Sequence, residues 1–264
     1  MIDTHCHLTF PDFANCVDAT LTEADQAGVT GVITVSTTPD DAQQALAIAN
    51  AHERVWCTAG AHPLYADESS FDWDALTRVA RQPKCVAWGE LGLDNHYDKP
   101  VKAAQRRVLD EQLALIASLR KDEASPVDLP VVVHCRKAFD ELIPILRETS
   151  LPPERFVFHC FTGDSRDMRL LLDFGAWVSF TGVVTYRNAK EVQEAALLAP
   201  ADRIMAETDA PYLTPEPHRK IRPNAPRYAI DTARFLAQLR SVAWDEFHAQ
   251  INANTRAFYG VPAA

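Results

Sequence analysis

Asp3-Thr4-His5-Cys6-His7 places two histidines one residue apart at the end of the first short apolar stretch of the chain. Because alternate residues of a β-strand point to the same face, we expect His5 and His7 to share a face and Cys6 to point the other way. Two neighbouring imidazoles supply half of the ligands of a typical transition-metal site. A single His-x-His pair arises easily by chance, so its meaning depends on what the ends of other strands carry.

Short apolar runs recur along the whole chain, and most of them are separated by helical patterns. The expected strands are residues 2–7, 31–36, 55–61, 85–90, 131–134, 156–160, 177–181 and 204–209. The expected helices include residues 39–52, 72–81, 101–119, 138–148, 164–174 and 189–198, with two more near 228–239 and 245–258. Thr38 or Pro39 and Ser70 are typical of helix starts, and Gly28 and Gly175 of helix ends.

Eight strands alternating with helices predict an α/β fold, a (β/α)8 TIM-type barrel with extra C-terminal helices. A doubly wound open sheet is the competing arrangement. It would need a glycine-rich phosphate turn after the first strand, and the sequence has none there. Since barrels of this size commonly form one domain, residues 1–264 are expected to form a single barrel domain. Residues 121–128 and the proline-rich residues 211–226 are expected to be loops.

Composition narrows the classes of function. The 264 residues carry a formal net charge of −10, which argues against broad non-specific adhesion to duplex nucleic acid. A phosphate-bearing substrate stays open, because bound divalent ions can reverse the local field. No uncharged apolar stretch is long enough to span a membrane. Asp3 and His5 stand where a signal peptide needs basic and apolar residues, so a cytoplasmic protein without membrane attachment is expected.

The cysteines are expected to be reduced thiols in a chain without a secretion signal. Cys6, Cys135 and Cys160 each directly follow a histidine of an expected strand end. If those histidines face the interior of the barrel, strand alternation turns the three cysteines outward. We therefore expect them to pack in the helix layer as small buried apolar residues.

Potential metal ligands collect at the C-terminal ends of the strands, which is where barrel enzymes carry their active sites. They are His5, His7, Glu90, His134, His159 and Asp209. Six such ligands exceed what one ion normally uses, so two divalent ions are expected. We assign His5, His7 and Asp209 to one ion. His134 and His159 belong to the other, and Glu90 is shared because a carboxylate has two oxygens that can bridge. The ions could be Zn²⁺, Mg²⁺ or Mn²⁺.

Further residues have expected roles around this centre. Asp209 is expected to accept the proton of the attacking water as well as to bind metal, and Glu90 to support catalysis as the bridging ligand. Glu207 shares a face with Asp209 and is a candidate partner that orients a ligand. His62 could contact substrate or only hold a loop. Arg136 shares a face with His134, where a guanidinium suits a phosphate or carboxylate, or it could be a solvated loop residue.

The chain resembles the TatD family of metal-dependent deoxyribonucleases, within the amidohydrolase-like superfamily, almost from end to end. The motifs that carry the resemblance are Asp3-Thr4-His5-Cys6-His7-Leu8, Gly60-Ala61-His62-Pro63, Gly89-Glu90-Leu91-Gly92-Leu93-Asp94, Pro130-Val131-Val132-Val133-His134-Cys135-Arg136, His159-Cys160-Phe161-Thr162-Gly163 and Glu207-Thr208-Asp209-Ala210-Pro211-Tyr212-Leu213, with Asn254 near the C-terminus. The resemblance implies a two-metal barrel that hydrolyses DNA phosphodiesters, commonly as a 3′→5′ exonuclease. It implies the same six metal ligands, with Glu90 in place of the carboxylated lysine that bridges metals in many superfamily members. It also implies that His62 and Arg136 touch substrate phosphate.

One segment departs from the family pattern Pro-x-Arg-Gly-x-x-Asn-Glu-Pro. This chain has Pro217-His218-Arg219-Lys220-Ile221-Arg222-Pro223-Asn224-Ala225-Pro226, which lacks the glycine, gains one residue and replaces the glutamate by Ala225. Because glycine permits backbone conformations that Lys220 resists, this loop is expected to run differently and to alter fine specificity.

Three functions follow from these observations. The leading hypothesis is a two-metal phosphodiesterase acting on single-stranded DNA or frayed ends, without an obligate protein partner. The alternative keeps the metal centre for an amide, ester or lactone, including D-aminoacyl-tRNA deacylation, because a fold does not determine a reaction. A metal-stabilised binding protein without turnover is the third, and the complete ligand set argues against it.

Overall fold

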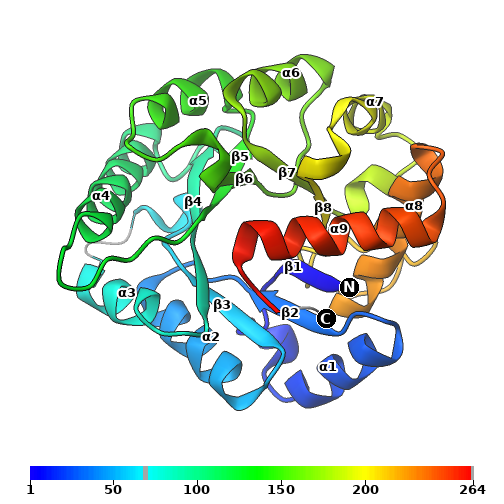
Figure 1. Ribbon diagram of the computed structural model, residues 1–264, viewed down its shortest axis with the longest axis horizontal. Helices are drawn as coiled ribbons and strands as arrows, with labels where there is room; N and C mark the ends of the chain where they lie inside the picture. The colour runs from blue at the N-terminus through cyan, green and yellow to red at the C-terminus, as the bar shows by residue number, and fades with distance from the viewer. Residues whose placement is uncertain (68–70, 263–264) are drawn as a thin grey trace.

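The computed structural model describes residues 1–67 and 71–262, and within them eight parallel strands form one sheet in the order β1 to β8 (Figure 1). The strands are β1 (Ile2–Cys6), β2 (Gly31–Thr34), β3 (Val55–Ala59), β4 (Cys85–Asp94), β5 (Val131–Arg136), β6 (Phe156–Phe158), β7 (Trp177–Phe180) and β8 (Ile204–Ala206). The backbone N–H of Asp209 donates to the His5 carbonyl at 2.9 Å, and that of His7 donates to the Ala210 carbonyl at 2.8 Å. These bonds join the end of β8 to β1, and the predicted (β/α)8 barrel is confirmed.

Helices connect the strands and surround the barrel (Figure 1). They are α1 (Val17–Gln26), α2 (Pro39–Ala51), α3 (Trp73–Ala80), α4 (Lys102–Arg120), α5 (Phe139–Arg147), α6 (Ser165–Phe174), α7 (Lys190–Leu198), α8 (Ala229–Leu239) and α9 (Trp244–Tyr259). Short 3₁₀ helices lie at Pro11–Phe13, Pro63–Tyr65, Pro153–Arg155, Gly182–Thr185, Ala201–Arg203 and Pro226–Tyr228. The predicted C-terminal helices are present as α8 and α9. The predicted helices did not include α1.

The helix boundaries follow local sequence signals. Thr38 caps α2 by accepting the N–H of Asp41, as its position before Pro39 predicts. Gly175 ends α6 with φ at +96°, a conformation that glycine adopts without strain. Ser70 lies outside the described residues, and Asp72 caps α3. None of the described helices is both long and apolar enough to cross a bilayer.

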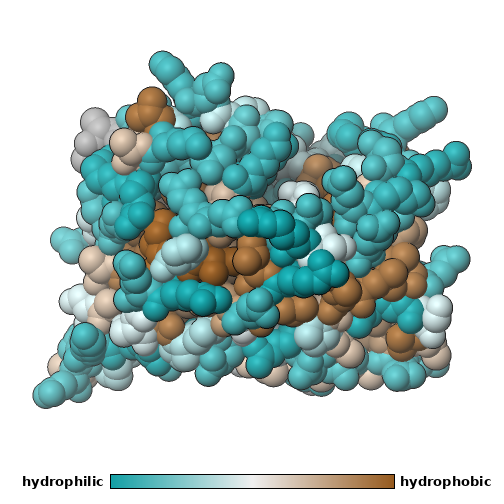
Figure 2. Space-filling model, turned by 90° about the horizontal axis from the view of Figure 1, so that it is seen from above, coloured by the Kyte–Doolittle hydropathy of each residue, from teal (hydrophilic) through white to brown (hydrophobic). Residues whose placement is uncertain are grey.

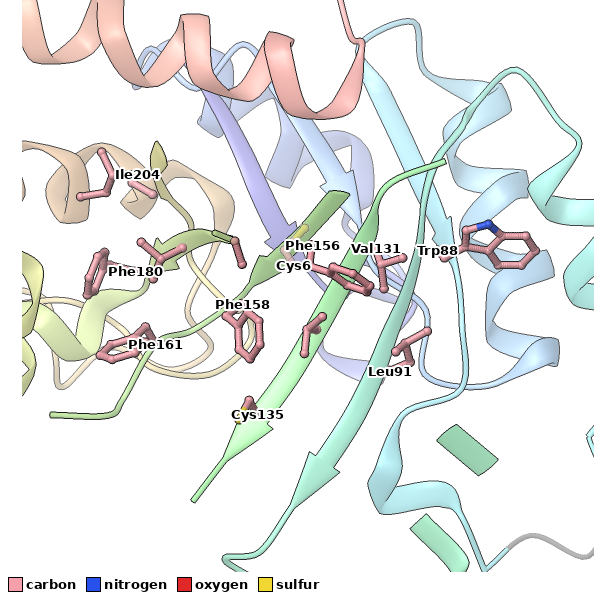
Figure 3. Packing of buried hydrophobic residues seen from close by; sticks show 14 of the residues in the cluster. Cys6, Trp88, Leu91, Val131, Cys135, Phe156, Phe158, Phe161, Phe180 and Ile204 are labelled. Carbon is pink, nitrogen blue, oxygen red and sulfur yellow. The ribbon is translucent and has the colours of Figure 1, made fainter. Parts of the chain in front are cut away.

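The main hydrophobic core lies between the sheet and the surrounding helices (Figure 3). Parallel strands have both faces covered, which is why they read as continuous apolar runs in the sequence. Cys6 and Cys135 pack in this layer among residues such as Phe158, so the prediction for these two cysteines is confirmed. Outside the core the surface is largely hydrophilic, as Figure 2 shows for one side of the molecule.

The end of the barrel where the strands begin is filled and covered. Phe258 and Tyr259 at the end of α9 cluster with inward-facing strand residues such as Ile33 and Met205. In Figure 1, α9 runs across the barrel at this end. The opposite end, where the strands finish, is the one that carries the open cavity described below.

Strand β4 is longer than predicted, because it continues past Glu90 to Asp94. Its pairing with β5 shifts in register between Trp88 and Leu91. Gly92 has φ at +149°, and a Cβ at this position would collide with the His134 carbonyl oxygen. The close approach of the two strands brings Asp94 to the same end of the barrel as His134.

Candidate active site

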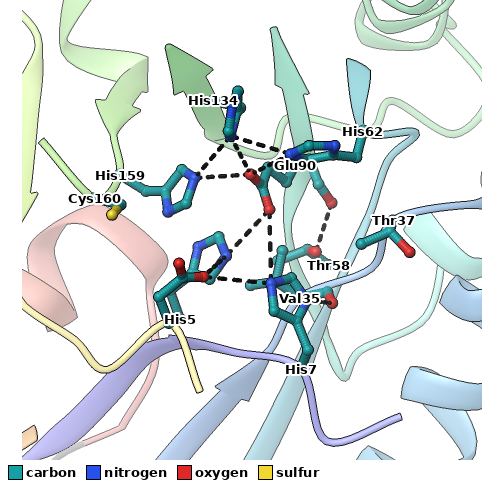
Figure 4. Close-up of polar contacts among 12 residues, drawn as sticks. His5, His7, Val35, Thr37, Thr58, His62, Glu90, His134, His159 and Cys160 are labelled. Atoms are coloured by element: carbon teal, nitrogen blue, oxygen red, sulfur yellow. Dashed lines mark hydrogen bonds and ion pairs between the residues drawn. The ribbon is translucent and has the colours of Figure 1, made fainter. Parts of the chain in front are cut away.

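Glu90 lies at the centre of a cluster of histidines at the open end of the barrel (Figure 4). Its Oε2 atom lies 3.1 Å from His5 Nε2 and 4.0 Å from His7 Nε2. Its Oε1 atom lies 2.8 Å from His134 Nδ1 and 2.7 Å from His159 Nε2. The two carboxylate oxygens therefore face two different histidine pairs.

Asp209 completes the side of the cluster that holds the first histidine pair. Its Oδ1 atom lies 3.4 Å from His7 Nε2 and 3.7 Å from His5 Nε2. Asp209 follows β8, and its φ of +56° is uncommon for a residue other than glycine. The hydrogen bond from its N–H to the His5 carbonyl holds it beside β1.

Hydrogen bonds at the outer nitrogens determine which imidazole nitrogen carries a lone pair toward Glu90. His7 Nδ1 donates to the Val35 carbonyl at 3.0 Å, so in the neutral ring Nε2 carries the lone pair. His134 Nε2 donates to Asp94 Oδ2 at 3.0 Å, so in the neutral ring Nδ1 carries the lone pair. Metal-binding histidines usually have such a partner on the second nitrogen.

His159 has a carboxylate partner as well. Its Nδ1 atom lies 3.3 Å from Glu207 Oε1. Glu207 is itself held by the Ser179 hydroxyl, which donates to Oε2 at 2.6 Å, and by the Cys160 N–H, which donates to Oε1 at 2.7 Å. The structure thus places Glu207 beside a candidate ligand, where the sequence analysis expected an orienting partner.

His62 differs from the four other histidines in its hydrogen bonds. Its Nδ1 atom accepts the N–H of Leu64 at 3.0 Å, so the proton is on Nε2. This Nε2–H points at Glu90 Oε1, 3.1 Å away. Burial lowers the pKa of His62 to about 4, although the charge of Glu90 opposes this shift, and the ring is therefore neutral. His62 is therefore a neutral hydrogen-bond donor beside the centre.

The carboxylates of the cluster are ionised despite their burial. Burial would raise the pKa of Glu90, but His159, His62 and His5 hold it well below its ordinary value. For Asp94, burial is likewise outweighed, chiefly by its hydrogen bonds from His134 and the His96 N–H, and the pKa falls to about 2. Although burial opposes it, the neighbouring carboxylates raise the pKa values of His7, His134 and His159, so a cation that binds these rings would displace protons from the site.

The donor set fits divalent metal ions. His5 Nε2 is buried and, among the described residues, makes no hydrogen bond, although it points toward Glu90. A buried polar atom without a hydrogen bond is costly, and a cation would satisfy it. Within the described residues, ligand atoms converge in three overlapping groups, namely His5, His159 and Asp209; His5, His7 and Glu90; and His62, Glu90 and His134. Imidazole and carboxylate donors suit Zn²⁺ or Mn²⁺.

The cluster forms the floor of a cavity of about 910 Å³. Arg136 and Lys137 at the end of β5 line it, together with aromatic side chains. The Arg136 guanidinium lies over the ring of Tyr97, 5.3 Å from its centroid. As its place at the end of a predicted strand suggests, Arg136 lies at this end of the barrel, in the cavity wall.

Two features differ from the sequence analysis. Asp94 was not assigned a role, because the predicted strand stopped at Glu90 and left Asp94 in a loop. The prediction for Cys160 is wrong, because this residue is absent from the buried cluster in which Cys135 packs and lies only in the cavity lining. Strand β6 ends at Phe158, and Cys160 has φ at +45°, so strand alternation no longer sets its direction.

Comparisons with known proteins agree with this geometry. Residues 2–260 match a family model described as TatD related DNase. The 3′-5′ ssDNA/RNA exonuclease TatD of Erwinia amylovora is 36% identical over 267 residues, which cover 99% of this chain and 100% of that protein. The uncharacterized metal-dependent hydrolase YcfH of Escherichia coli K12 is 35% identical over 249 residues, covering 93% and 90% of the two chains.

A solved structure gives the same result. The crystal structure of YjjV, a TatD homologue from Escherichia coli K12, superposes with a TM-score of 0.88 at 31% sequence identity. The match covers 99% of this chain and 98% of that one. The chain therefore belongs to the TatD-related DNase family and is a metal-dependent hydrolase.

Proposed function

We propose that this protein is a two-metal phosphodiesterase that removes nucleotides from single-stranded or frayed DNA ends, in the 3′→5′ direction. The observation that carries the proposal is the position of Glu90, whose two oxygens face separate histidine pairs. His5, His7 and Asp209 would hold one ion, and His134 and His159 the other, with Glu90 shared. Paired divalent ions, when bound, activate water and neutralise charge on a phosphoryl group.

The residues around the ions divide the remaining work. Asp209 faces the cavity, and its interaction with His7 outweighs burial and lowers its pKa, so the carboxylate is free to accept a proton at Oδ1. Asp94 would hold the His134 ring through its hydrogen bond, and Glu207, 3.3 Å from His159 Nδ1, would orient the His159 ring. His62 presents an N–H donor, which suits a phosphate oxygen and not a metal ion.

The charge of the cavity wall supports an anionic substrate. The chain has a formal net charge of −10, yet Arg136 and Lys137 both line the mouth of this site. Arg136 makes no ion pair with any of the described residues, so its charge is available to a phosphate. The relatives named 3′-5′ ssDNA/RNA exonuclease support a nucleic-acid substrate and the direction of cleavage.

The test is a time course with metal-stripped protein on single-stranded DNA labelled at the 3′ or the 5′ end. Mg²⁺, Mn²⁺ and Zn²⁺ are added separately, and RNA and blunt duplex DNA of the same sequence are compared. We expect the 3′ label to be released by the first cleavage. The 5′-labelled strand should shorten one nucleotide at a time and give a ladder of products. Asp209→Asn should abolish it while the circular dichroism spectrum is unchanged, and His248→Asn on α9 is the matched control.

Intact DNA and RNA under every metal, with ions demonstrably bound, would reject the phosphodiesterase. The same metal centre would then be assayed on amide, ester and lactone substrates, including D-aminoacyl-tRNA. Stepwise loss from the 5′ end would retain the chemistry and reject the proposed direction.

A further inference from the structure

Four aromatic side chains surround the mouth of the cavity, namely Phe10, Tyr65, Tyr97 and Tyr212, here called the aromatic collar. Phe10 is half-buried, whereas Tyr65, Tyr97 and Tyr212 are 38%, 50% and 53% exposed. Among the described residues, every strongly exposed Phe, Tyr or Trp ring is one of these three tyrosines. Exposed rings gathered at one opening indicate a ligand with apolar flat surfaces.

Each ring is tied to a polar residue of the site that lies three positions earlier in the chain. The N–H of Phe10 donates to the His7 carbonyl at 3.1 Å, and that of Tyr65 to the His62 carbonyl at 3.0 Å. The N–H of Tyr212 donates to the Asp209 carbonyl at 2.9 Å. These bonds close tight turns, so the backbone that carries each ring is held close to a residue of the site.

Tyr97 is tied in the same way through a side chain. Its N–H donates to Asp94 Oδ1 at 3.4 Å, while the other oxygen of Asp94 holds His134. The guanidinium of Arg136 lies over the Tyr97 ring. A positive charge and a ring are thus presented together next to the second histidine pair.

The rings of the collar lie beside different histidines of the site. Phe10 stacks on His7 at 4.6 Å between centroids and meets Tyr212 edge-on at 6.2 Å, so this pair lies beside the first histidine pair. Tyr97 lies beside the second pair, through Asp94 and His134. A phosphate between the two histidine pairs would have one aromatic surface on each side of it.

We infer that the aromatic collar stacks on the unpaired bases that flank the scissile phosphate, and that it selects single strands without reading base identity. This inference rests on the proposed function and adds the chemical group that the site recognises, an unpaired base. Stacking tolerates any base, since every base has a flat face. Bases in an intact duplex are already stacked on their neighbours, so the collar can engage only splayed bases.

The test compares a single-stranded oligonucleotide with a copy in which the last two nucleotides at the cleaved end are abasic. Tyr212→Ala and Tyr97→Ala should each raise KM on the normal strand by about tenfold, with kcat little changed. Both variants should leave KM on the abasic strand unchanged. Tyr212→Phe and Tyr97→Phe keep the ring and should behave as the wild type, as should Leu197→Ala, an exposed residue on α7.

Equal losses on normal and abasic strands would overturn the inference, because the tyrosines would then act on the phosphate or the metal centre. Unchanged KM in both alanine variants would overturn it as well. Fluorescence anisotropy measures the affinity of metal-loaded protein for the same two strands, and it tests the inference even if neither strand is cleaved. Wild-type protein that binds the normal strand more tightly than the abasic one but cleaves neither would retain the collar and reject the proposed function.

Discussion

Asp94 Oδ2 accepts a hydrogen bond from His134 Nε2 at 3.0 Å, on the side of the ring that points away from Glu90. The contact fixes the tautomer in which Nδ1 carries the lone pair toward the centre of the site. It depends on the extension of β4 beyond Glu90, which carries Asp94 alongside β5. A neutral imidazole oriented in this way is ready to bind a metal ion.

Asp94→Asn should weaken binding of one ion, about 10- to 100-fold, while leaving the other nearly unaffected. The Asn amide stabilises the Nε2–H group of His134 less strongly than the Asp94 carboxylate does. His134 therefore loses its fixed tautomer and becomes less basic. Isothermal titration of the metal-stripped protein with Mn²⁺ or Zn²⁺ measures both sites. Asp98→Asn, an exposed aspartate four residues further on, is the control. Two sites of unchanged affinity would remove Asp94 from the list of positioning residues.

Glu90→Gln should reduce the bound metal by at least half. The substitution removes the negative charge and replaces one oxygen by an NH₂ group that repels a cation, so it removes the bridge that is proposed for Glu90. Elemental analysis of the dialysed, metal-loaded protein gives the stoichiometry. Glu148→Gln at the surface should retain the wild-type value. A Glu90→Gln protein that still holds two ions would show that the bridge lies elsewhere.

Arg136→Ala should raise KM on phosphodiester substrates about tenfold, with metal content unchanged. The guanidinium lies in the cavity wall over Tyr97 and not among the metal ligands. Arg136→Lys keeps a charge but loses the planar group, so an intermediate KM is expected. Steady-state kinetics combined with elemental analysis measures both quantities, and an unchanged KM in the alanine variant would exclude a substrate contact.

Metal binding should stabilise the fold, because it satisfies buried groups such as His5 Nε2. At a free-ion concentration one hundred times the dissociation constant, each ion that binds only the native state adds about 2.7 kcal/mol. Differential scanning fluorimetry with chelator or with Mn²⁺ should therefore show a higher Tm with metal. His5→Asn should lose much of this increase, and His248→Asn should keep it. Equal shifts in the two variants would contradict the assignment of His5.

Asp3 should make folding stability depend on pH. The residue is fully buried, and burial raises its pKa from 3.8 to about 8 although hydrogen bonds from Thr208 oppose the shift. Between these values the folded state keeps a proton that the unfolded state has lost. Stability therefore falls as pH rises through this window, by at most about 1.4 kcal/mol per pH unit, and levels off above pH 8.

Asp3→Asn removes this titration. The free energy of unfolding of the variant, relative to the wild type, should rise with pH up to about 8 and then stay constant. Urea denaturation in the presence of a chelator, at a series of pH values, measures the difference. A difference that does not change with pH would contradict the raised pKa of Asp3.

Some of the expected strands differ from the structure at their C-terminal ends, where the chain leaves regular geometry. The pattern of apolar residues predicts strands well where both faces of the sheet are covered. It correctly indicated that His5 and His7 point to the same side. It failed at Cys160, which lies beyond the end of β6 with a positive φ. Beyond a strand end, side-chain direction depends on turns whose conformation is set by neighbouring strands.

The sequence by itself determined the barrel and the collection of ligands at one end. Alternating apolar runs and helical patterns are local properties of the chain, and parallel pairing of the strands brings all their C-terminal ends to the same end of the barrel. The sharing of Glu90 was predicted from the sequence, and only the tertiary structure decided which of its oxygens faces which histidine pair. It likewise decided that Asp94 supports His134 and that Phe10 and Tyr212 meet at the mouth of the cavity. The physical reason is that these are contacts of a few ångströms between residues far apart in the chain, set by strand register and hydrogen-bonded turns that residue spacing does not encode.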